Sequence, residues 1–159
     1  MLVILHAGQT GVERGAHRAA TATAIFVAGF MPLDKRDELG PIPREIAEVL
    51  TPCPERGVRS AVRSNIKIAS AVLLVVPDQS RVERFTAMTA VLQAIRAARI
   101  PSLICDPATN LADVTTWGGR VCSTSGSRRI LVTGPRETRW MDGESVARRM
   151  VTAIGMTLK

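Results

Sequence analysis

Five short apolar runs, separated by segments of helical pattern, are the feature that most restricts the fold of this 159-residue chain. The strongest run is Ala71–Val76 (AVLLVV), in which every residue is apolar. Uninterrupted apolar runs are typical of parallel strands covered on both faces, whereas half-exposed strands alternate apolar and polar residues. The other predicted strands are Leu2–Leu5, Ile25–Ala28, Ser102–Cys105 and Ile130–Thr133.

Helical patterns fill most of the chain between these runs. Pro43–Leu50 opens with proline, which is favoured at the first position of a helix. In Gly143–Leu158 the apolar residues recur near one face, as expected for a helix packed on a core. The other predicted helices are Val12–Ala24, Ser60–Ala69 and Arg84–Ala98, and the predicted loops are Met31–Pro43 and Gly118–Arg129.

This alternation predicts βαβ units with right-handed crossovers, and therefore an α/β fold. We expect a Rossmann-like, doubly wound and mainly parallel sheet with helices on both faces. No internal repeat or linker is present in the sequence, so residues 1–159 are expected to form a single domain. Sheets of this class bind ligands beyond the carboxyl ends of their strands.

The composition of the chain limits the classes of molecule that it is expected to bind. The net charge of +7 favours anionic partners such as phosphates, nucleotides or nucleic acid, although excess charge also serves solubility. Aromatic residues make up only 3% of the chain, which argues against a surface that stacks nucleic-acid bases. Without an apolar stretch of membrane-spanning length or a signal peptide, the sequence predicts a cytoplasmic protein with no membrane partner. Three scattered cysteines predict neither a disulfide framework nor a metal site.

The turn after the first strand is the first candidate site. Gly8 and Gly11 permit backbone angles or close approaches that a side chain hinders, and Gln9 and Thr10 add polar groups. The following helix N-terminus would add unpaired N–H groups, which suit a phosphate. The alternative is a tight strand-to-helix connection, because Gly-x-x-Gly is neither the dinucleotide fingerprint nor the P-loop. Glu13, at the start of that helix, is expected on a solvated face.

Three segments carry a resemblance to a known family. AGQTGVERGAHRAA (residues 7–20), AGFMPLDKRDELGPIP (28–43) and VTGPRET (132–138) resemble, in this order, the molybdenum carrier (molybdenum cofactor carrier-like) family. That family belongs to a Rossmann-like superfamily that includes the lonely-guy nucleotide hydrolases and the DNA-processing protein DprA. The resemblance implies an oligomeric parallel-sheet domain that holds the molybdenum cofactor (molybdopterin) or a nucleotide-like ligand without transforming it.

The resemblance also implies a set of ligand-binding positions, with no catalytic residue and no metal held by the protein. Glu38 would orient the ligand, and its alternative role is to cap the adjacent helix. The complete set is Gly8, Gln9, Thr10, Gly11, Arg14, Pro32, Glu38, Asn65, Thr86, Thr89, Gly134 and Arg136.

One departure from the family pattern bears directly on the ligand. Arg84 and Phe85 stand where the family has two glycines before Thr86. Those glycines let the backbone approach a phosphate, and a phenylalanine side chain should obstruct that approach. Arg84 could compensate by pairing with phosphate directly. The sequence therefore predicts a changed ligand, a weakened site or a remodelled one.

Several candidates have structural alternatives of similar weight. Arg136 suits a phosphate or a carboxylate, and could instead pair with Glu137 or Glu144. Asn65 could hydrogen-bond a ligand or tie a helix to a strand. A basic cluster that could meet a phosphate tail, or simply form a solvated helix face, consists of Arg56, Arg59 and Arg63.

The sequence thus favours a carrier of a phosphate-bearing heterocyclic ligand, a homo-oligomer without covalent chemistry. The first alternative is a glycosidase-type hydrolase of nucleoside 5′-monophosphates, although the chain has no glutamate where lonely-guy enzymes carry theirs. The second is a nucleic-acid-binding module, which the scarce aromatic residues disfavour. The third is an oligomeric scaffold whose pocket has lost its ligand.

Overall fold

The central sheet has five parallel strands in the order β2-β1-β9-β7-β8. The computed structural model describes residues 1–123 and 128–158. The last strand in the chain lies in the middle of the sheet, where it pairs with both β1 and β7. The predicted Rossmann-like α/β class and the five predicted strands are confirmed. Their bounds are β1 Leu2–Leu5, β2 Phe26–Ala28, β7 Ala71–Val75, β8 Ser102–Cys105 and β9 Arg128–Thr133.

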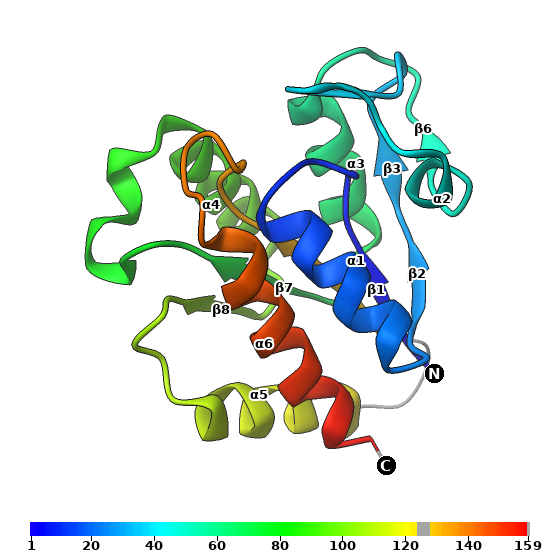
Figure 1. The fold of residues 1–159 in the computed structure, drawn as a ribbon. Helices are drawn as coiled ribbons and strands as arrows, with labels where there is room; N and C mark the ends of the chain where they lie inside the picture. The colour runs from blue at the N-terminus through cyan, green and yellow to red at the C-terminus, as the bar shows by residue number, and fades with distance from the viewer. Residues whose placement is uncertain (124–127, 159) are drawn as a thin grey trace.

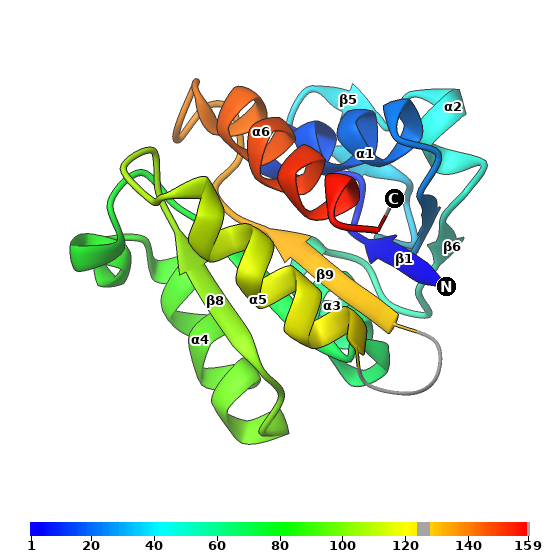
Figure 2. The same ribbon diagram turned by 90° about the horizontal axis from the view of Figure 1, so that it is seen from below.

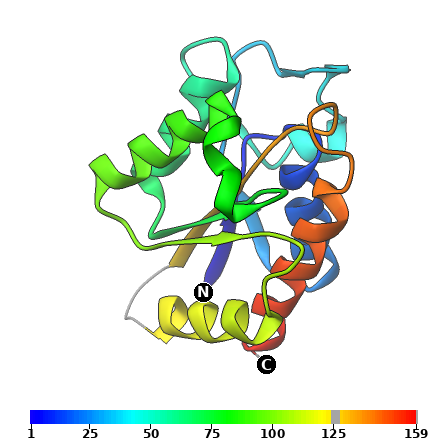
Figure 3. The same ribbon diagram turned by 90° about the vertical axis from the view of Figure 1, so that its left-hand side faces the viewer.

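Helices cover both faces of this sheet (Figures 1, 2 and 3). On one face lie α1 (Val12–Ala22), α5 (Leu111–Ser123) and α6 (Gly143–Met156), and on the other lie α3 (Val58–Ile68) and α4 (Thr86–Ala98). Strand β7 explains the uninterrupted apolar pattern. Its odd-numbered residues pack into the α1–α5–α6 core and its even-numbered residues into the α3–α4 core, so no position faces water.

Helices α1 and α6 cross at close range because Gly15 has no side chain. A Cβ at Gly15 would lie only 2.1 Å from the carbonyl oxygen of Glu144. Four apolar residues of the predicted segment Gly143–Leu158 lie on the buried face of α6, whereas Leu158 follows the helix and is exposed. The four buried ones are Val146, Met150, Val151 and Ile154.

The segment after β2 leaves the main sheet and folds into small elements of its own. These are β3 (Phe30–Met31), β4 (Arg36–Asp37), β5 (Gly40–Pro41), α2 (Arg44–Ala47) and β6 (Thr51–Pro52). They enclose a small apolar cluster of Met31, Ile42, Ile46 and Leu50. The predicted Met31–Pro43 loop therefore includes an antiparallel hairpin, β4–β5, and the predicted helix Pro43–Leu50 is reduced to four residues.

The predicted Gly118–Arg129 loop is wrong over residues 118–123, which form the last turns of α5, and over Arg128 and Arg129, which begin β9. Residues 124–127 of that prediction lie outside the described part of the chain. Threonines and two adjacent glycines make this a weak helix by intrinsic preference, but tertiary packing decides its conformation. Gly118 lies against Ile154 of α6, Val114 is fully buried, and Trp117 packs on the same core.

The chain after β7 also differs slightly from the sequence pattern. A 3₁₀ helix, η1, spans Gln79–Arg84, and α4 begins at Thr86 rather than at Arg84. Cys105, the last residue of β8, is fully buried. Within the described residues, no helix is both long enough and apolar enough to cross a membrane.

Candidate functional site

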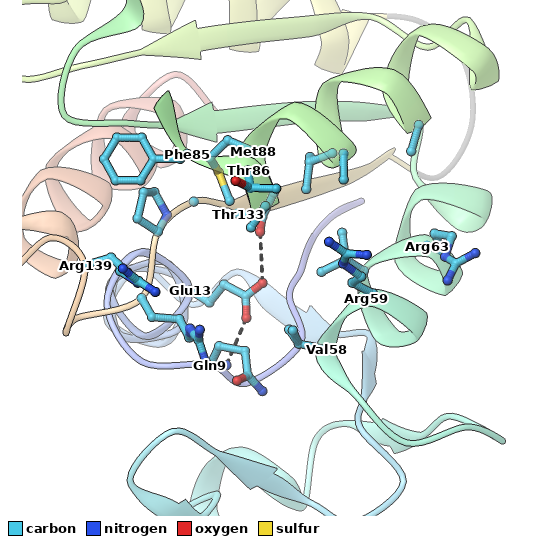
Figure 4. A pocket seen from close by; sticks show the side chains of 18 of the residues that line it. Gln9, Glu13, Val58, Arg59, Arg63, Phe85, Thr86, Met88, Thr133 and Arg139 are labelled. Carbon is cyan, nitrogen blue, oxygen red and sulfur yellow. Dashed lines mark hydrogen bonds between the residues drawn. The ribbon is translucent and has the colours of Figure 1, made fainter. Parts of the chain in front are cut away.

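A pocket of about 990 Å³ opens where β1 and β9 end, the edge at which this class of sheet binds ligands (Figure 4). Four segments form its walls. They are the turn after β1 with the first turn of α1, one side of α3, the start of α4, and the loop between β9 and α6. We refer to it as the arginine-lined pocket, because its lining includes Arg59, Arg63, Arg84, Arg136 and Arg139.

The charge of this pocket is strongly unbalanced. Five arginines line it against one acidic residue, Glu13, in the described part of the chain. Arg136 Nε lies 3.8 Å from Glu38, and the other four arginines form no ion pair with any described acidic residue. All five side chains are solvent-exposed. Such guanidinium groups suit phosphate oxygens, which they can bind in a bidentate manner.

A second part of the same pocket is apolar. Helices α3 and α4 line it with aliphatic side chains, and Phe85 adds the aromatic ring at the start of α4. Small-molecule sites commonly combine an apolar lining with a few fixed polar groups. The pocket thus offers one region for an anionic group and another for an apolar or heterocyclic one. The aliphatic residues are Val58, Val62, Ile66, Met88, Val91 and Ala94.

The turn after β1 is not an open cradle. The N–H groups of Ala7 and Gln9 donate to Glu13 Oε2 at 3.2 and 2.9 Å, and the N–H of Gly8 donates to His6 Nδ1 at 2.9 Å. Three amides that would have faced an anion are therefore satisfied by the protein's own side chains. A cavity does lie beside these three amides, since Gln9 and Glu13 line the arginine-lined pocket.

Glu13 is the residue that the sequence reasoning missed. It is only 2% exposed, not on a solvated helix face, and its Oε1 accepts a hydrogen bond from Thr133 Oγ1 at 3.1 Å. Burial raises the pKa of Glu13 to about 7, although the hydrogen bonds from Gln9, Thr133 and Ala7 and the charge of Arg14 act in the opposite direction. An acidic residue in the first turn of a helix that follows a glycine turn is the sequence signal that could have identified it.

Three loops meet beside the pocket through Glu38. Its carboxylate accepts hydrogen bonds from the hydroxyls of Thr10 and Thr138, and from the Thr138 N–H at 3.2 Å. Burial raises the pKa of Glu38, but these hydrogen bonds and the charge of Arg136 outweigh it, so the net shift is downward. Arg14 pairs with Asp37 of the same hairpin.

Glycine is required where the turn after β1 meets the loop after β9. Gly11 has φ +76°, and a Cβ there would lie 2.8 Å from both Glu137 N and Pro135 O. Gly134 approaches β7 and α1 so closely that a Cβ would lie 2.1 Å from Val75 O. These two predicted site glycines shape the pocket floor through contacts between backbones.

The remaining predicted residues divide into those near the pocket and those elsewhere. Thr86 lines the pocket, whereas Thr89 does not, and its hydroxyl lies 3.4 Å from Phe85 O. Asn65 is fully buried, and its side chain bonds both Phe30 N at 2.7 Å and Phe30 O at 3.0 Å. Asn65 thus ties α3 to β3. Pro32 is buried in a turn outside the pocket lining.

The two histidines form a hydrogen-bonded pair away from the pocket lining. His6 Nε2 and His17 Nδ1 lie 3.1 Å apart. Because His6 Nδ1 accepts the Gly8 N–H, the hydrogen of neutral His6 is on Nε2, which donates to His17. Burial, with the nearby His17 and Arg14, lowers the pKa of His6 to about 3. No group of three metal-ligating side chains is present among the described residues.

Comparison with known proteins agrees with the fold described above. The crystal structure of a "Putative molybdenum carrier protein" from Syntrophus aciditrophicus SB has the same fold, with a TM-score of 0.82. It is 17% identical, and the match covers 96% of this chain and 93% of that one. No curated protein matches the chain. A sequence model of the circularly permuted YpsA SLOG family matches residues 4–154, so the chain belongs to that family.

Proposed function

We propose that this protein binds and carries a small, phosphate-bearing heterocyclic ligand in the arginine-lined pocket, without covalent chemistry. The observation that carries the proposal is the excess of arginines over acidic side chains in one pocket at the ligand-binding edge of the sheet. A volume of about 990 Å³ is in the range of sites for nucleotide-sized molecules. The name of the structural neighbour makes the molybdenum cofactor one candidate ligand, and a nucleotide is the other.

In this proposal the phosphate lies against arginine side chains rather than inside the turn after β1. Arg59 and Arg63 of α3 face it from one side, and Arg84 takes the place of the glycine backbone expected before Thr86. The first amides of α4 add a favourable field, because this helix begins at the pocket and no side chain caps it. The heterocycle would pack on the aliphatic residues of α3 and α4.

The other predicted site residues then divide by role. Gln9, Thr86 and Arg136 are proposed to contact the ligand, since they line the pocket. A second group is proposed to hold the loops in shape: Gly8, Thr10, Gly11, Arg14, Glu38 and Gly134. Pro32, Asn65 and Thr89 are proposed to act only through the fold.

A direct test is to purify the native protein, denature it, and examine the released small molecules by mass spectrometry. The expected result is a pterin or a nucleotide. Calorimetry with a panel of nucleoside 5′-monophosphates provides the second measurement. If nothing is released and nothing binds, the carrier proposal fails.

The placement of the phosphate is tested by replacing both arginines of α3 with glutamine. Arg59→Gln/Arg63→Gln should weaken binding at least tenfold, because each lost charge-assisted contact is worth about 1.5–3 kcal/mol. Arg44→Gln/Arg96→Gln is the matched control, since it removes the same charge from exposed helix positions outside the pocket lining. Equal affinity in both double variants would show that the phosphate lies elsewhere.

Hydrolysis of nucleoside 5′-monophosphates is the second candidate function, and one observation favours it. Glu13 lies in the pocket with a pKa raised to about 7 by burial, as befits a proton donor at neutral pH. Release of free base from a nucleotide panel, measured by chromatography, would support it if Glu13→Gln abolished the release. Absence of turnover at all pH values from 5 to 8 would eliminate hydrolysis and leave the carrier function as the remaining proposal.

Three further expectations form part of the proposal. The chain is proposed to act as one domain over residues 1–159, as a homo-oligomer, and in the cytoplasm. Light scattering coupled to size-exclusion chromatography measures the subunit number. Limited proteolysis that yields two stable fragments would contradict the single domain.

A further inference from the structure

Glu13 holds a position at the floor of the arginine-lined pocket that an anion could otherwise occupy. Its Oε2 atom accepts two N–H groups of the turn after β1, and its Oε1 atom faces Thr133 on the central strand β9 (Figure 4). The carboxyl group is buried, yet it belongs to the lining of the pocket. An acidic group fixed in a pocket of otherwise positive charge would repel an anionic ligand while it is ionised.

The hydrogen bonds around Glu13 suit both protonation states. When Glu13 is ionised, the Thr133 hydroxyl donates to Oε1 at 3.1 Å. When Glu13 is protonated on Oε1, the same hydroxyl rotates and accepts, because a threonine hydroxyl can donate or accept. Both backbone N–H groups keep Oε2 as their acceptor in either state. Glu13 can therefore gain or lose a proton with no rearrangement other than the rotation of the Thr133 hydroxyl.

We propose that binding of an anion in the arginine-lined pocket is coupled to the uptake of a proton by Glu13. This coupling rests on the proposed function, since it presupposes that the pocket receives an anionic group. Protonation removes the repulsion between Glu13 and the ligand and leaves all five pocket arginines charged. Binding would then weaken as the pH rises through the range in which free Glu13 ionises.

The charged groups around Glu13 are consistent with this assignment. Arg14 follows Glu13 on α1, and its charge acts on the Glu13 carboxyl. Arg59 and Arg63 face the pocket from α3. Arg84 precedes α4, and Arg136 and Arg139 follow β9. Arginines stay charged at any working pH. Burial raises the pKa of Glu13 to about 7, so its proton exchanges near neutral pH.

Other titrating groups near the turn do not explain a pH dependence above neutrality. The pKa of His6 is lowered to about 3 by burial and by the nearby His17 and Arg14, so it stays neutral. Burial also lowers the pKa of His17, so this ring is neutral above pH 7. The pKa of Glu38 is shifted downward overall, so Glu38 remains ionised.

The experiment uses inorganic sulfate as the probe, because its charge does not change between pH 6 and pH 9. The Kd for sulfate is measured at several pH values from the ligand-induced rise in Tm and by calorimetry. Glu13→Gln mimics the protonated state, since its amide oxygen accepts both N–H groups and its NH₂ donates to Thr133. Glu48→Gln, at the exposed position that follows α2, removes the same charge elsewhere.

Wild-type protein and Glu48→Gln should both lose affinity for sulfate between pH 6 and pH 9, on the order of tenfold if the bound anion raises the pKa of Glu13 by about one unit. Glu13→Gln should change by less than about twofold over the same range. Calorimetry of the wild type at pH 7.5, in buffers of different ionisation enthalpy, should report uptake of about half a proton. This calorimetric measurement uses the wild type alone, so it tests the coupling even if Glu13→Gln does not fold.

The outcomes separate the two proposals. Sulfate binding with pH-independent affinity and no proton uptake overturns the coupling and leaves the carrier function intact. Equal pH dependence in wild type and Glu13→Gln overturns the coupling in the same way. Absence of binding by sulfate and by nucleotides at every pH, with no small molecule released from the native protein, overturns both proposals. Nucleotide binding without any sulfate binding also overturns the coupling, because the proposal requires that the pocket bind a simple anion.

Discussion

The stability of the folded protein should depend on pH through Glu13, and Glu13→Gln should remove that dependence. Its pKa is raised from 4.5 to about 7 in the fold, mainly by burial. A raised pKa means that the folded state holds the proton more tightly than the unfolded chain. The stabilisation is complete below pH 4.5 and is lost progressively as the pH rises to about 7.

The magnitude follows from the size of the shift. A difference of about 2.5 units corresponds to about 3 kcal/mol, and this group is too deeply buried for solvent to screen the effect. Glutamine keeps the hydrogen bonds to the turn and to Thr133 but carries no charge. Relative to the wild type, the free energy of unfolding of Glu13→Gln should therefore grow by about 3 kcal/mol between pH 4.5 and pH 8.

Urea denaturation followed by circular dichroism, repeated at half-unit pH intervals, measures this difference. For a chain of this length, about 3 kcal/mol corresponds to a rise in Tm of roughly 6–12 °C at pH 8. Glu48→Gln, which loses an exposed carboxylate, should follow the wild-type curve. Parallel curves for Glu13→Gln and the wild type would refute the argument, since they would show that Glu13 ionises in the fold as easily as in the unfolded chain.

Three further substitutions test other parts of the structure. Gly15→Ala should destabilise the protein by about 1–3 kcal/mol, measured by urea denaturation, because the new methyl group would meet the Glu144 carbonyl; full stability would mean that α1 and α6 do not cross at that distance. Asn65→Ala should reduce the free energy of unfolding by about 2–3 kcal/mol, because it leaves the Phe30 backbone groups unpaired. The Kd of the folded protein for nucleotides should not change. A loss of binding without a loss of stability would instead assign Asn65 to the ligand. The pKa of Glu38 is lowered, so ionised Glu38 stabilises the fold above pH 4.5, and this stabilisation is lost as the pH falls below that value. Glu38→Gln should therefore reduce the loss of stability that the wild type shows at acid pH. An unchanged stability profile would contradict this.

The main layers of the fold could be predicted from the sequence because they depend on local patterns. Ala71–Val76 is apolar at every position since both faces of β7 are covered, and that pattern identifies a parallel, doubly wound sheet without further information. The apolar face of Gly143–Met156 identified the last helix in the same way. The ordered motifs in residues 7–20, 28–43 and 132–138 indicated the family.

Helix α5 could not be predicted in the same manner. Its middle contains two threonines and two adjacent glycines, whose intrinsic preference is against a helix. It forms because Gly118 lets it approach Ile154 on α6 and because Val114 is buried there. Those contacts join segments more than thirty residues apart in the chain, and no local pattern reports them.

The same distinction applies to the site. The sequence by itself determined which residues could bind an anion, because the chemistry of arginine, of glycine and of a helix N-terminus does not depend on the rest of the fold. These residues are the turn after β1, the loop after β9 and the basic residues of α3. Only the tertiary structure decided that Glu13 turns inward to satisfy the turn's own N–H groups, and that Arg59 and Arg63 line one pocket with Arg136. The physical reason is that burial and charge balance depend on which distant segments pack together, and that packing is a property of the whole fold.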